Sequence, residues 1–376
     1  MVHSQDLTSI RWENAGCPIC GQSRPVVLLE CYSQPFARTF QLVRCYDCGM
    51  GYTNPRPQVT DLAQLYPAHY AAYRGCPSMK IGWCKRQRMR LEKWSAYVSV
   101  HGRKKWLRRL AQLLFHSIAP RSDTLLSFAM EGEGRLLDFG CGVGEYASKM
   151  QQRGWQVDGI DLSNHAAQKA QQLYGFSVWV GSLPHPNVKP QSYDMITMGQ
   201  VLEHIPNPHQ IISSALEALK PNGRLVISVP NLESWGRQAF GKYWWPLQMP
   251  WHVLHFTPSA LTALMRMHGF AIESIQMMKP THWFGRSWQA GQADGWKKQT
   301  PPIMPILGRW RWVQSVFTRW LAWTKQADGI LLIARRPKSV QPSLKHWPVR
   351  ENSPQIYQAS SPVSFHSKER ARLPAF

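Results

Sequence analysis

The central part of the chain alternates short apolar runs with segments whose apolar residues recur at helical spacing. The runs are short and mostly rich in β-branched residues, as is typical of buried strands; they read "RLLDFG", "WQVDGIDLS", "FSVWVG", "YDMITMGQ" and "RLVISVP". Between them lie amphipathic segments, of which 209–223 places its apolar residues on one helical face: Ile211, Ile212, Ala215, Leu216 and Leu219. This alternation predicts a parallel sheet with crossover helices.

Two more strands are expected at 270–278 and 329–336, separated by a Trp-rich insertion over 280–328. The helix before them, "TPSALTALMRMHG", opens with Thr and Pro, which favour a helix start. For residues 130–337 we therefore predict an α/β fold, a Rossmann-like, doubly wound, seven-stranded sheet.

The regions on either side of this domain differ from it in amino-acid composition and pattern. Residues 11–57 contain two C-x-x-C pairs and predict a small zinc ribbon, 60–128 predict a basic helical segment, and 338–376 a disordered, Pro- and Ser-rich tail. The formal charge of +22 favours anionic partners, either nucleic acid, an anionic membrane face or acidic substrates. The first residues do not read as a secretory signal, and no run of about 18 apolar residues occurs. We expect a cytoplasmic protein, with peripheral attachment to the inner membrane face as an open alternative.

The stretch "LLDFGCGVGEY" has glycines at 140, 142 and 144 directly after the first strand. A dinucleotide-binding loop would place its third glycine at 145, where this chain has Glu145, an unfavourable neighbour for a pyrophosphate. Asp161, at the end of the second strand, lies where such folds bind ribose hydroxyls. The pattern therefore predicts a ligand that has a ribose with free hydroxyl groups and that places no phosphate at the loop.

Four segments resemble, in order and spacing, the motifs of class I S-adenosylmethionine-dependent methyltransferases: "LLDFGCGVGEY", "GIDLS", "YDMITMGQVLEHIPNP" and "LKPNGRLVISVPN". The resemblance covers about 134–336. It implies that the three glycines approach the methionine portion of S-adenosylmethionine, Asp138 its amino group and Asp161 its ribose. It further implies that Leu162 lies against the adenine, Gln200 near the methyl group, and Ser182 where many relatives have an acidic residue for the adenine amino group.

The segment "LEHIPNP" resembles small-molecule methyltransferases, including the ubiquinone-type O-methyltransferases. Some of these read E-x-x-E-H and hold a divalent cation; Gln200 replaces the first acid here, which disfavours a metal. His204 is a candidate general base, or else a residue that ties down its loop. His252 and His255, in a resembling "H-x-x-H-F-T-P" segment, could flank the acceptor; alternatively His255 caps the next helix and the nearby aromatics fill the core.

Two C-x-x-C-G pairs, 24 residues apart, predict a structural zinc site with the ligands Cys17, Cys20, Cys45 and Cys48. Four thiolates complete a tetrahedral zinc and leave no open position. The text "CYDCGMGYTNPRP" also resembles the N-terminal zinc ribbon of this methyltransferase subgroup.

The segment "ILGRWRWVQSVFTRWLAW" spaces apolar residues along one helical face: Trp310, Val313, Phe317, Trp320 and Leu321. That pattern suits either an interfacial helix on anionic lipid or a lid over the acceptor. The whole chain predicts methyl transfer to a small-molecule, lipid or saccharide acceptor, in cell-envelope or quinone-type biosynthesis. The alternatives are an RNA methyltransferase, with nucleic acid the less favoured partner, and a non-catalytic cofactor-binding scaffold. The acceptor, the methylated atom and the oligomeric state stay open.

Overall fold

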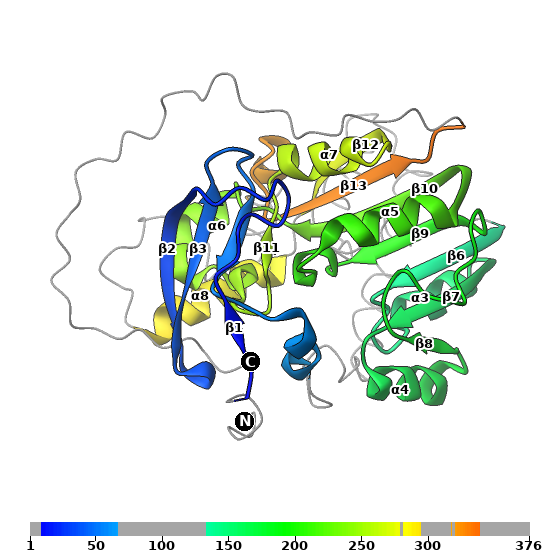
Figure 1. Ribbon diagram of the computed structural model, residues 1–376, viewed down its shortest axis with the longest axis horizontal. Coiled ribbons are helices and arrows are strands. Elements are labelled where there is room, and N and C mark those ends of the chain that lie inside the picture. Colours follow the sequence, from blue (N-terminus) through cyan, green and yellow to red (C-terminus); the bar gives the residue numbers. More distant parts are fainter. Residues whose placement is uncertain (1–8, 67–132, 279–280, 295–316, 318–319, 339–376) are drawn as a thin grey trace, which may run out of the picture.

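The computed structural model describes residues 9–66, 133–278, 281–294, 317 and 320–338. Its main sheet has seven strands in the order β12-β13-β10-β9-β6-β7-β8 (Figure 1). The strands are β6 Gly134–Phe139, β7 Trp155–Asp161, β8 Val178–Val180, β9 Tyr193–Gly199, β10 Leu219–Pro230, β12 Ala271–Met278 and β13 Gly329–Arg335. β13 is antiparallel to both of its neighbours, and the pairs from β8 across to β10 are parallel. The predicted seven-stranded α/β sheet is confirmed.

The chain enters this sheet at its centre and changes direction there. From β6 it runs outward through β7 to β8, then returns to β9 on the other side of β6. The carboxyl ends of β6 and β9 therefore lie side by side at a point where the strand order reverses, which is where open α/β sheets bind ligands. The glycine loop follows β6, and the short helix η6 (Leu202–His204) follows β9.

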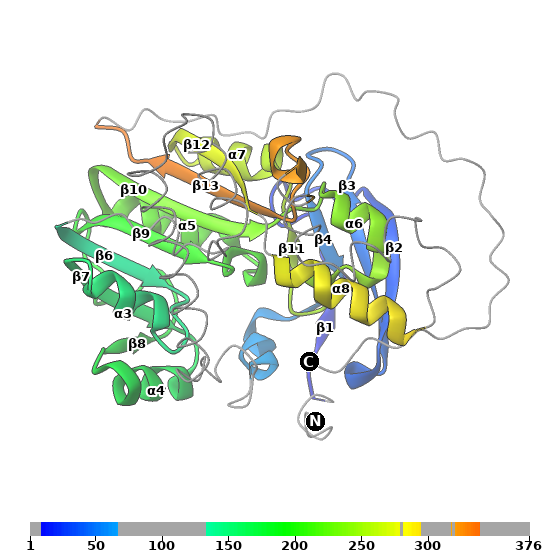
Figure 2. The same ribbon diagram turned by 180° about the vertical axis from the view of Figure 1, so that it is seen from behind.

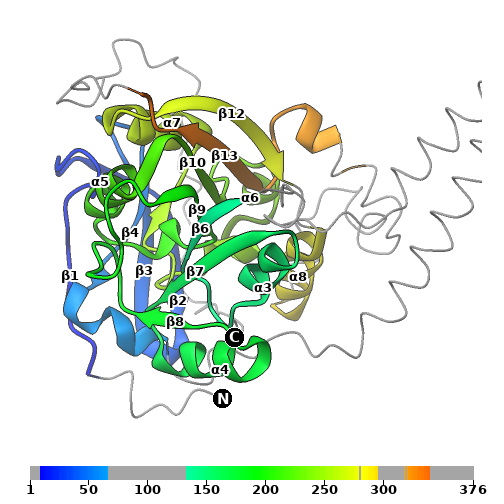
Figure 3. The same cartoon turned by 90° about the vertical axis from the view of Figure 1, so that its right-hand side faces the viewer.

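Helices cover both faces of the sheet, and Figure 3 shows α3 (Glu145–Gln151) and α5 (Pro208–Ala218) on opposite sides of the strands. α4 (Asn164–Tyr174) and α7 (Pro258–Met267) begin with side-chain caps. Ser163 accepts a hydrogen bond from the Ala166 backbone, and Thr257, as predicted, accepts one from Ala260. One expectation was wrong: α5 ends at Ala218, so Leu219 begins strand β10 and does not extend the helical face.

The N-terminal region forms a second sheet, of four strands, in the order β11-β4-β3-β2. The N-terminal region contains β1 Trp12–Glu13, β2 Pro25–Ser33, η1 Gln34–Phe36, β3 Arg38–Cys45, β4 Gly51–Asn54, β5 Arg56–Pro57 and η2 Val59–Leu65. β1 and β5 pair with each other in a separate two-stranded sheet. The fourth strand, β11 (Leu254–His255), comes from the second half of the chain and pairs with β4, Leu254 opposite Tyr52. A Cβ added at Gly51 would lie 2.5 Å from Leu232 and 2.8 Å from the His255 carbonyl. Residues 11–57 therefore pack closely against the rest of the protein.

A second hydrophobic core joins this sheet to the segment after β10. That segment contains α6 (Trp235–Phe240), η7 (Gly241–Tyr243) and η8 (Trp245–Leu247), and α8 (Thr281–Ala293) packs beside it (Figure 2). The buried residues are Cys31, Phe40, Leu42, Leu232, Phe240, Trp244, Leu247, Met249 and Phe284. Trp244 also donates a hydrogen bond from its indole to Asp328 at 2.9 Å. Trp244 is therefore a core residue, which was the second interpretation given above for the aromatic residues near His252 and His255.

Several sequence predictions fall outside the described residues. The basic segment 60–128 is described only up to residue 66, where it is a 3-10 helix, and the tail only at Lys338. Of the Trp-rich face, Phe317 packs on Trp235 with ring centroids 4.8 Å apart and Leu321 is buried, whereas Trp320 is half exposed. Within the described part of the chain, every helix is too short or too polar to cross a membrane.

Candidate functional site

The three glycines after β6 share a left-handed backbone, with φ of 74°, 53° and 78°, but they have different surroundings. A Cβ on Gly140 would lie 2.3 Å from Val201, and one on Gly144 would lie 3.0 Å from the Phe176 ring. A Cβ on Gly142 would meet no described atom within 4 Å. Gly140 and Gly144 are therefore required by packing, while Gly142 borders open space at the rim of the sheet.

Asp161 ties this loop to the end of β7. Its carboxylate accepts hydrogen bonds from the backbone N–H of Gly142 at 2.8 Å and of Ser163 at 2.9 Å. A carboxylate offers two acceptor oxygens, which is the chemistry that a pair of ribose hydroxyls requires. Leu162, the next residue, is 46% exposed, an apolar side chain presented at the same rim.

Asp138 lies at the end of β6, buried beside the loop. Its Oδ1 accepts a hydrogen bond from the Thr197 hydroxyl at 2.7 Å. Burial, with a smaller contribution from the negative charge of Asp161, raises the pKa of Asp138 to about 7, against the opposing effect of Thr197. A nearby ammonium group would restore the ionised form, which fits the implied contact with the amino group of the cofactor.

The two remaining cofactor candidates lie on neighbouring loops of the rim. Ser182 follows β8 and is half-buried, and the Gly181 N–H before it donates to the Asp161 carbonyl at 2.9 Å. Gln200 has a left-handed backbone (φ 58°) and donates from its amide to the Ser228 hydroxyl at 3.2 Å. The Gln200 side chain is thereby held against β10.

A polar cluster lies around the segment that follows β9, at the carboxyl end of the strands where the glycine loop also lies. It consists of Glu203, His204 and His252, whose ligand atoms all lie within 4.8 Å of one another. Glu203 is fully buried, and neither carboxyl oxygen has a hydrogen-bond partner among the described residues. Burial raises the pKa of Glu203 to about 8 and lowers that of His204 to about 4, the latter against its bond to Trp251.

Backbone carbonyls determine which nitrogen of each histidine carries the proton. The Trp251 carbonyl lies 3.0 Å from Nδ1 of His204, and the Pro246 carbonyl 2.7 Å from Nδ1 of His252. A carbonyl only accepts, so both Nδ1 atoms carry hydrogen and both Nε2 atoms present a lone pair when neutral. Tyr66 adds its hydroxyl 2.9 Å from Nδ1 of His204.

His255 belongs to different surroundings. Its Nε2 donates to the Thr53 hydroxyl at 2.9 Å, and this hydroxyl in turn donates to the His252 carbonyl at 2.6 Å. The cap of the following helix is Thr257, so His255 does not have the capping role considered for it. The structure thus brings together His204 and His252, while His255 connects β11 to β4. Tyr66 and Thr53 carried no signal in the sequence, because each lies more than 130 residues from the histidine it contacts.

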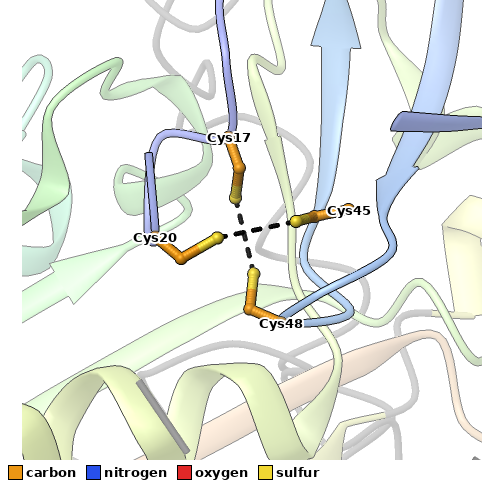
Figure 4. Close-up of side chains that lie close together, drawn as sticks. All are labelled: Cys17, Cys20, Cys45 and Cys48. Carbon is orange, nitrogen blue, oxygen red and sulfur yellow. Dashed lines mark hydrogen bonds between the residues drawn. The ribbon is translucent and has the colours of Figure 1, made fainter. Parts of the chain in front are cut away.

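The four predicted zinc ligands lie together at one end of the N-terminal sheet (Figure 4). The sulfurs of Cys17 and Cys48 are 3.4 Å apart, and those of Cys20 and Cys45 are 3.5 Å apart. Both pairs turn in the same way: Gly21 and Gly49 each have φ of 74° and donate to the carbonyl of the first cysteine at 2.9 Å. Four converging thiols on two matched turns form a donor set suited to tetrahedral zinc.

The first of these turns is also bonded to the main sheet through α5. His209 donates from Nε2 to the Ile19 carbonyl, inside the first cysteine pair, at 2.8 Å. Its Nδ1 lies 2.9 Å from Nε2 of His268, whose Nδ1 lies 3.0 Å from the Ser213 hydroxyl. Three side chains therefore connect the cysteine turn to two helices of the α/β sheet.

Comparison with known proteins agrees with this geometry. Residues 101–275 match a family model described as a methyltransferase domain. The match covers slightly less than half of the chain and includes the glycine loop, Asp161 and the segment after β9. A ubiquinone biosynthesis O-methyltransferase of Yersinia pestis is 30% identical over 151 residues, 38% of this chain and 59% of that protein. The corresponding enzyme of Idiomarina loihiensis is 33% identical over 111 residues, 27% of this chain and 45% of that protein.

The chain spans about half the length of the curated relatives that it matches. Among solved structures, a putative sarcosine dimethylglycine methyltransferase from Galdieria sulphuraria is 14% identical, with a TM-score of 0.39 over 62% of this chain and 88% of that one. A SAM-dependent methyltransferase from Archaeoglobus fulgidus is 17% identical, with a TM-score of 0.39 over 56% and 90%.

Proposed function

We propose that the protein transfers the methyl group of S-adenosylmethionine to a small-molecule acceptor. The observation that carries this proposal is the open space at Gly142, whose N–H donates to Asp161, together with the exposed Leu162 that follows Asp161 and the buried Asp138 near the end of β6. The Asp138 carboxyl suits an ammonium, the Asp161 carboxyl suits two ribose hydroxyls, and the apolar side chain suits an adenine face. With no basic side chain among these contacts, a phosphate would be poorly matched.

The transfer makes modest demands on the protein. An acceptor oxygen attacks the methyl carbon, the carbon–sulfur bond breaks, and S-adenosylhomocysteine leaves as a neutral thioether. The acceptor hydroxyl must also lose its proton, and we assign its uptake to the cluster after β9, where His204 presents the lone pair of Nε2. Alignment of donor and acceptor supplies most of the acceleration in this kind of reaction.

The relatives suggest a class of acceptor. Because they are ubiquinone biosynthesis O-methyltransferases, a hydroxyl on a quinone-type ring is the acceptor that we favour for this chain. Such acceptors are lipids, and Trp323, 80% exposed beside the half-exposed Trp320, offers an aromatic surface of the kind found at membrane interfaces. We therefore place the protein in the cytoplasm, in peripheral contact with an anionic membrane, and assign a structural Zn²⁺ to the four cysteines.

The test is incubation of the full chain with S-adenosylmethionine labelled in the methyl group and a fractionated cell extract. We expect label in the lipid fraction, and expect Asp161→Asn to abolish it because the new amide group would face the Gly142 N–H and a ribose hydroxyl. Label confined to RNA would instead support an RNA methyltransferase, for which the net charge of +22 is the favouring observation. Cofactor binding without label in any fraction would overturn the proposed transfer.

A further inference from the structure

Tyr66, directly after η2, contacts two parts of the site that are far from it in the sequence. Its hydroxyl lies 2.9 Å from Nδ1 of His204, and the centroids of the two rings are 5.7 Å apart. The same side chain packs against Val143 and Ala166. Val143 is the residue between the second and third glycines of the loop, and Ala166 lies in the first turn of α4. One side chain from the N-terminal region therefore contacts both the glycine loop and the candidate general base.

The backbone that carries Tyr66 is held by packing. Leu65, the residue before it, is 1% exposed and lies in a small core with Ile10 and Trp251. The Trp251 indole donates a hydrogen bond to the Leu65 carbonyl at 3.0 Å. Trp251 also provides the carbonyl that accepts from Nδ1 of His204, so one residue anchors both Tyr66 and its partner. The position of the Tyr66 side chain therefore depends on how the N-terminal region packs against the segment before β11.

The Tyr66 hydroxyl and the Trp251 carbonyl share one hydrogen-bond donor. A carbonyl only accepts, so Nδ1 of His204 carries the hydrogen, and the Tyr66 oxygen is a second acceptor for it. Two acceptors restrict the plane of the imidazole ring more than one acceptor does. Burial lowers the pKa of His204 to about 4, so the ring is neutral at neutral pH and Nε2 has a lone pair. Tyr66 thus helps to determine the direction of that lone pair without competing for it.

We propose that Tyr66 is a positioning residue with two separable effects. Its ring holds the glycine loop in the form that binds S-adenosylmethionine, and its hydroxyl orients His204 for uptake of the acceptor proton. This inference deepens the proposed function and rests on it. Tyr66 lies outside residues 101–275, which the methyltransferase family model matches, so the N-terminal region supplies a part of the site that the matched segment lacks. Small errors in the alignment of reacting groups slow a reaction strongly, which makes the effect of the hydroxyl measurable.

The first experiment measures the affinity of the full-length protein for S-adenosylmethionine by titration calorimetry. Tyr66→Phe keeps the ring and removes the hydroxyl, so its affinity should stay within about twofold of the wild type. Tyr66→Ala removes the ring that packs on Val143, and its affinity should fall at least about tenfold. Tyr46→Phe is the matched control, because Tyr46 belongs to the same N-terminal region but is 65% exposed; its affinity should not change.

The second experiment observes the Nδ1–H of His204 by NMR in protein labelled with ¹⁵N at histidine, with the signal assigned by its loss in His204→Gln. In Tyr66→Phe this resonance should move, and its exchange with solvent should become about two- to tenfold faster because one acceptor is lost. The Nδ1–H of His252, which the Pro246 carbonyl accepts, should not change. A role limited to stability would not alter one histidine and leave the other as it was.

The third measurement is the rate of methyl transfer from S-adenosylmethionine into the lipid fraction. Tyr66→Phe should lower kcat by about 10- to 100-fold and leave the KM for S-adenosylmethionine unchanged, whereas Tyr66→Ala should also raise that KM. If the wild type binds the cofactor but labels no fraction, the proposed transfer fails, while calorimetry and NMR still decide whether Tyr66 holds both parts of the site.

Three results would overturn the inference. Cofactor affinity of Tyr66→Ala equal to that of the wild type would remove the role of the ring. An unchanged His204 resonance in Tyr66→Phe would remove the role of the hydroxyl. Equal losses of affinity in Tyr66→Phe and Tyr66→Ala would show that the two effects are not separable. If Tyr66→Ala fails to fold, Tyr66→Leu, which keeps an apolar side chain, takes its place in the comparison.

Discussion

Replacing Gly140 and Gly142 by alanine, one at a time, separates the packing role of the loop from its role in cofactor binding. Both residues have a left-handed backbone, with φ of 74° and 53°, so both alanines incur a similar conformational cost. Only the Gly140 variant meets protein atoms, since its Cβ would lie 2.3 Å from one methyl group of Val201 and 2.8 Å from the other. Any difference in stability between the two variants therefore measures the contact with Val201.

The magnitudes follow from these two effects. A left-handed alanine costs about 1–2 kcal/mol, and forcing a methyl group into a packed site adds about 1–3 kcal/mol. Gly142→Ala should therefore lose about 1–2 kcal/mol and Gly140→Ala about 2–5 kcal/mol. For a domain of this size, 1 kcal/mol corresponds to about 2–4 °C in melting temperature. The expected losses are about 2–8 °C for Gly142→Ala and about 4–20 °C for Gly140→Ala.

The affinity for the cofactor should show the opposite order, with Gly142→Ala binding more weakly than Gly140→Ala. The Cβ of Gly142→Ala would occupy the open space assigned to the methionine portion of the cofactor. A clash of about 1–3 kcal/mol corresponds to a loss of about 5- to 150-fold in affinity. Gly144→Ala serves as a second packing control, because its Cβ would press on Phe176 at 3.0 Å and Ala170 at 3.2 Å.

Thermal unfolding without cofactor measures the first effect, and titration calorimetry with S-adenosylmethionine at a temperature where all variants are folded measures the second. If Gly142→Ala bound the cofactor as tightly as the wild type, the loop would not approach it, and the site would be misplaced. Equal melting temperatures for Gly140→Ala and Gly142→Ala would show that Val201 moves aside without cost.

Three further predictions concern the protonation of Asp138, the hydrogen bond from His209 to the first cysteine turn, and the four-cysteine site. Burial raises the pKa of Asp138 to about 7, and the cationic amino group of the cofactor favours the ionised carboxylate. The affinity for S-adenosylmethionine should therefore fall by up to about tenfold per pH unit as the pH drops below 7. Asp138→Asn should bind with an affinity that does not change with pH, and the same flat calorimetric profile in the wild type would argue against this contact. His209→Ala removes the donor to the Ile19 carbonyl, so we expect the free energy of unfolding to fall by about 1–3 kcal/mol and zinc to be released faster to a chelating dye. Lys189→Ala, on an exposed loop, is the control and should change neither quantity. Cys45→Ser should lower the melting temperature of the main sheet as well as that of the N-terminal sheet, because β11 of the N-terminal sheet comes from the chain between β10 and α7 of the main sheet. Calorimetry showing an unchanged transition of the main sheet would contradict this coupling.

Local sequence was sufficient for most of the main sheet. Strand and helix periodicity depend on residues a few positions apart, and caps such as Thr257 act on a backbone N–H three residues later. The boundary at Leu219 was misplaced because the same apolar residue satisfies either the last turn of a helix or the first position of a strand. Only the neighbouring strand β9, which pairs Tyr193 with Leu219, decides between them.

The sequence by itself determined the class of the fold, the glycine loop with its acidic partners, and the four cysteines, since each of these is written in residue type and short spacing. Tertiary structure alone decided that β11 completes the N-terminal sheet, that Tyr66 reaches His204, and that His252 joins Glu203. These contacts link residues about 50 to 200 positions apart, and no local pattern specifies them. They arise because packing two sheets against each other buries distant segments together, and a buried polar group must then find its partner among whatever lies beside it.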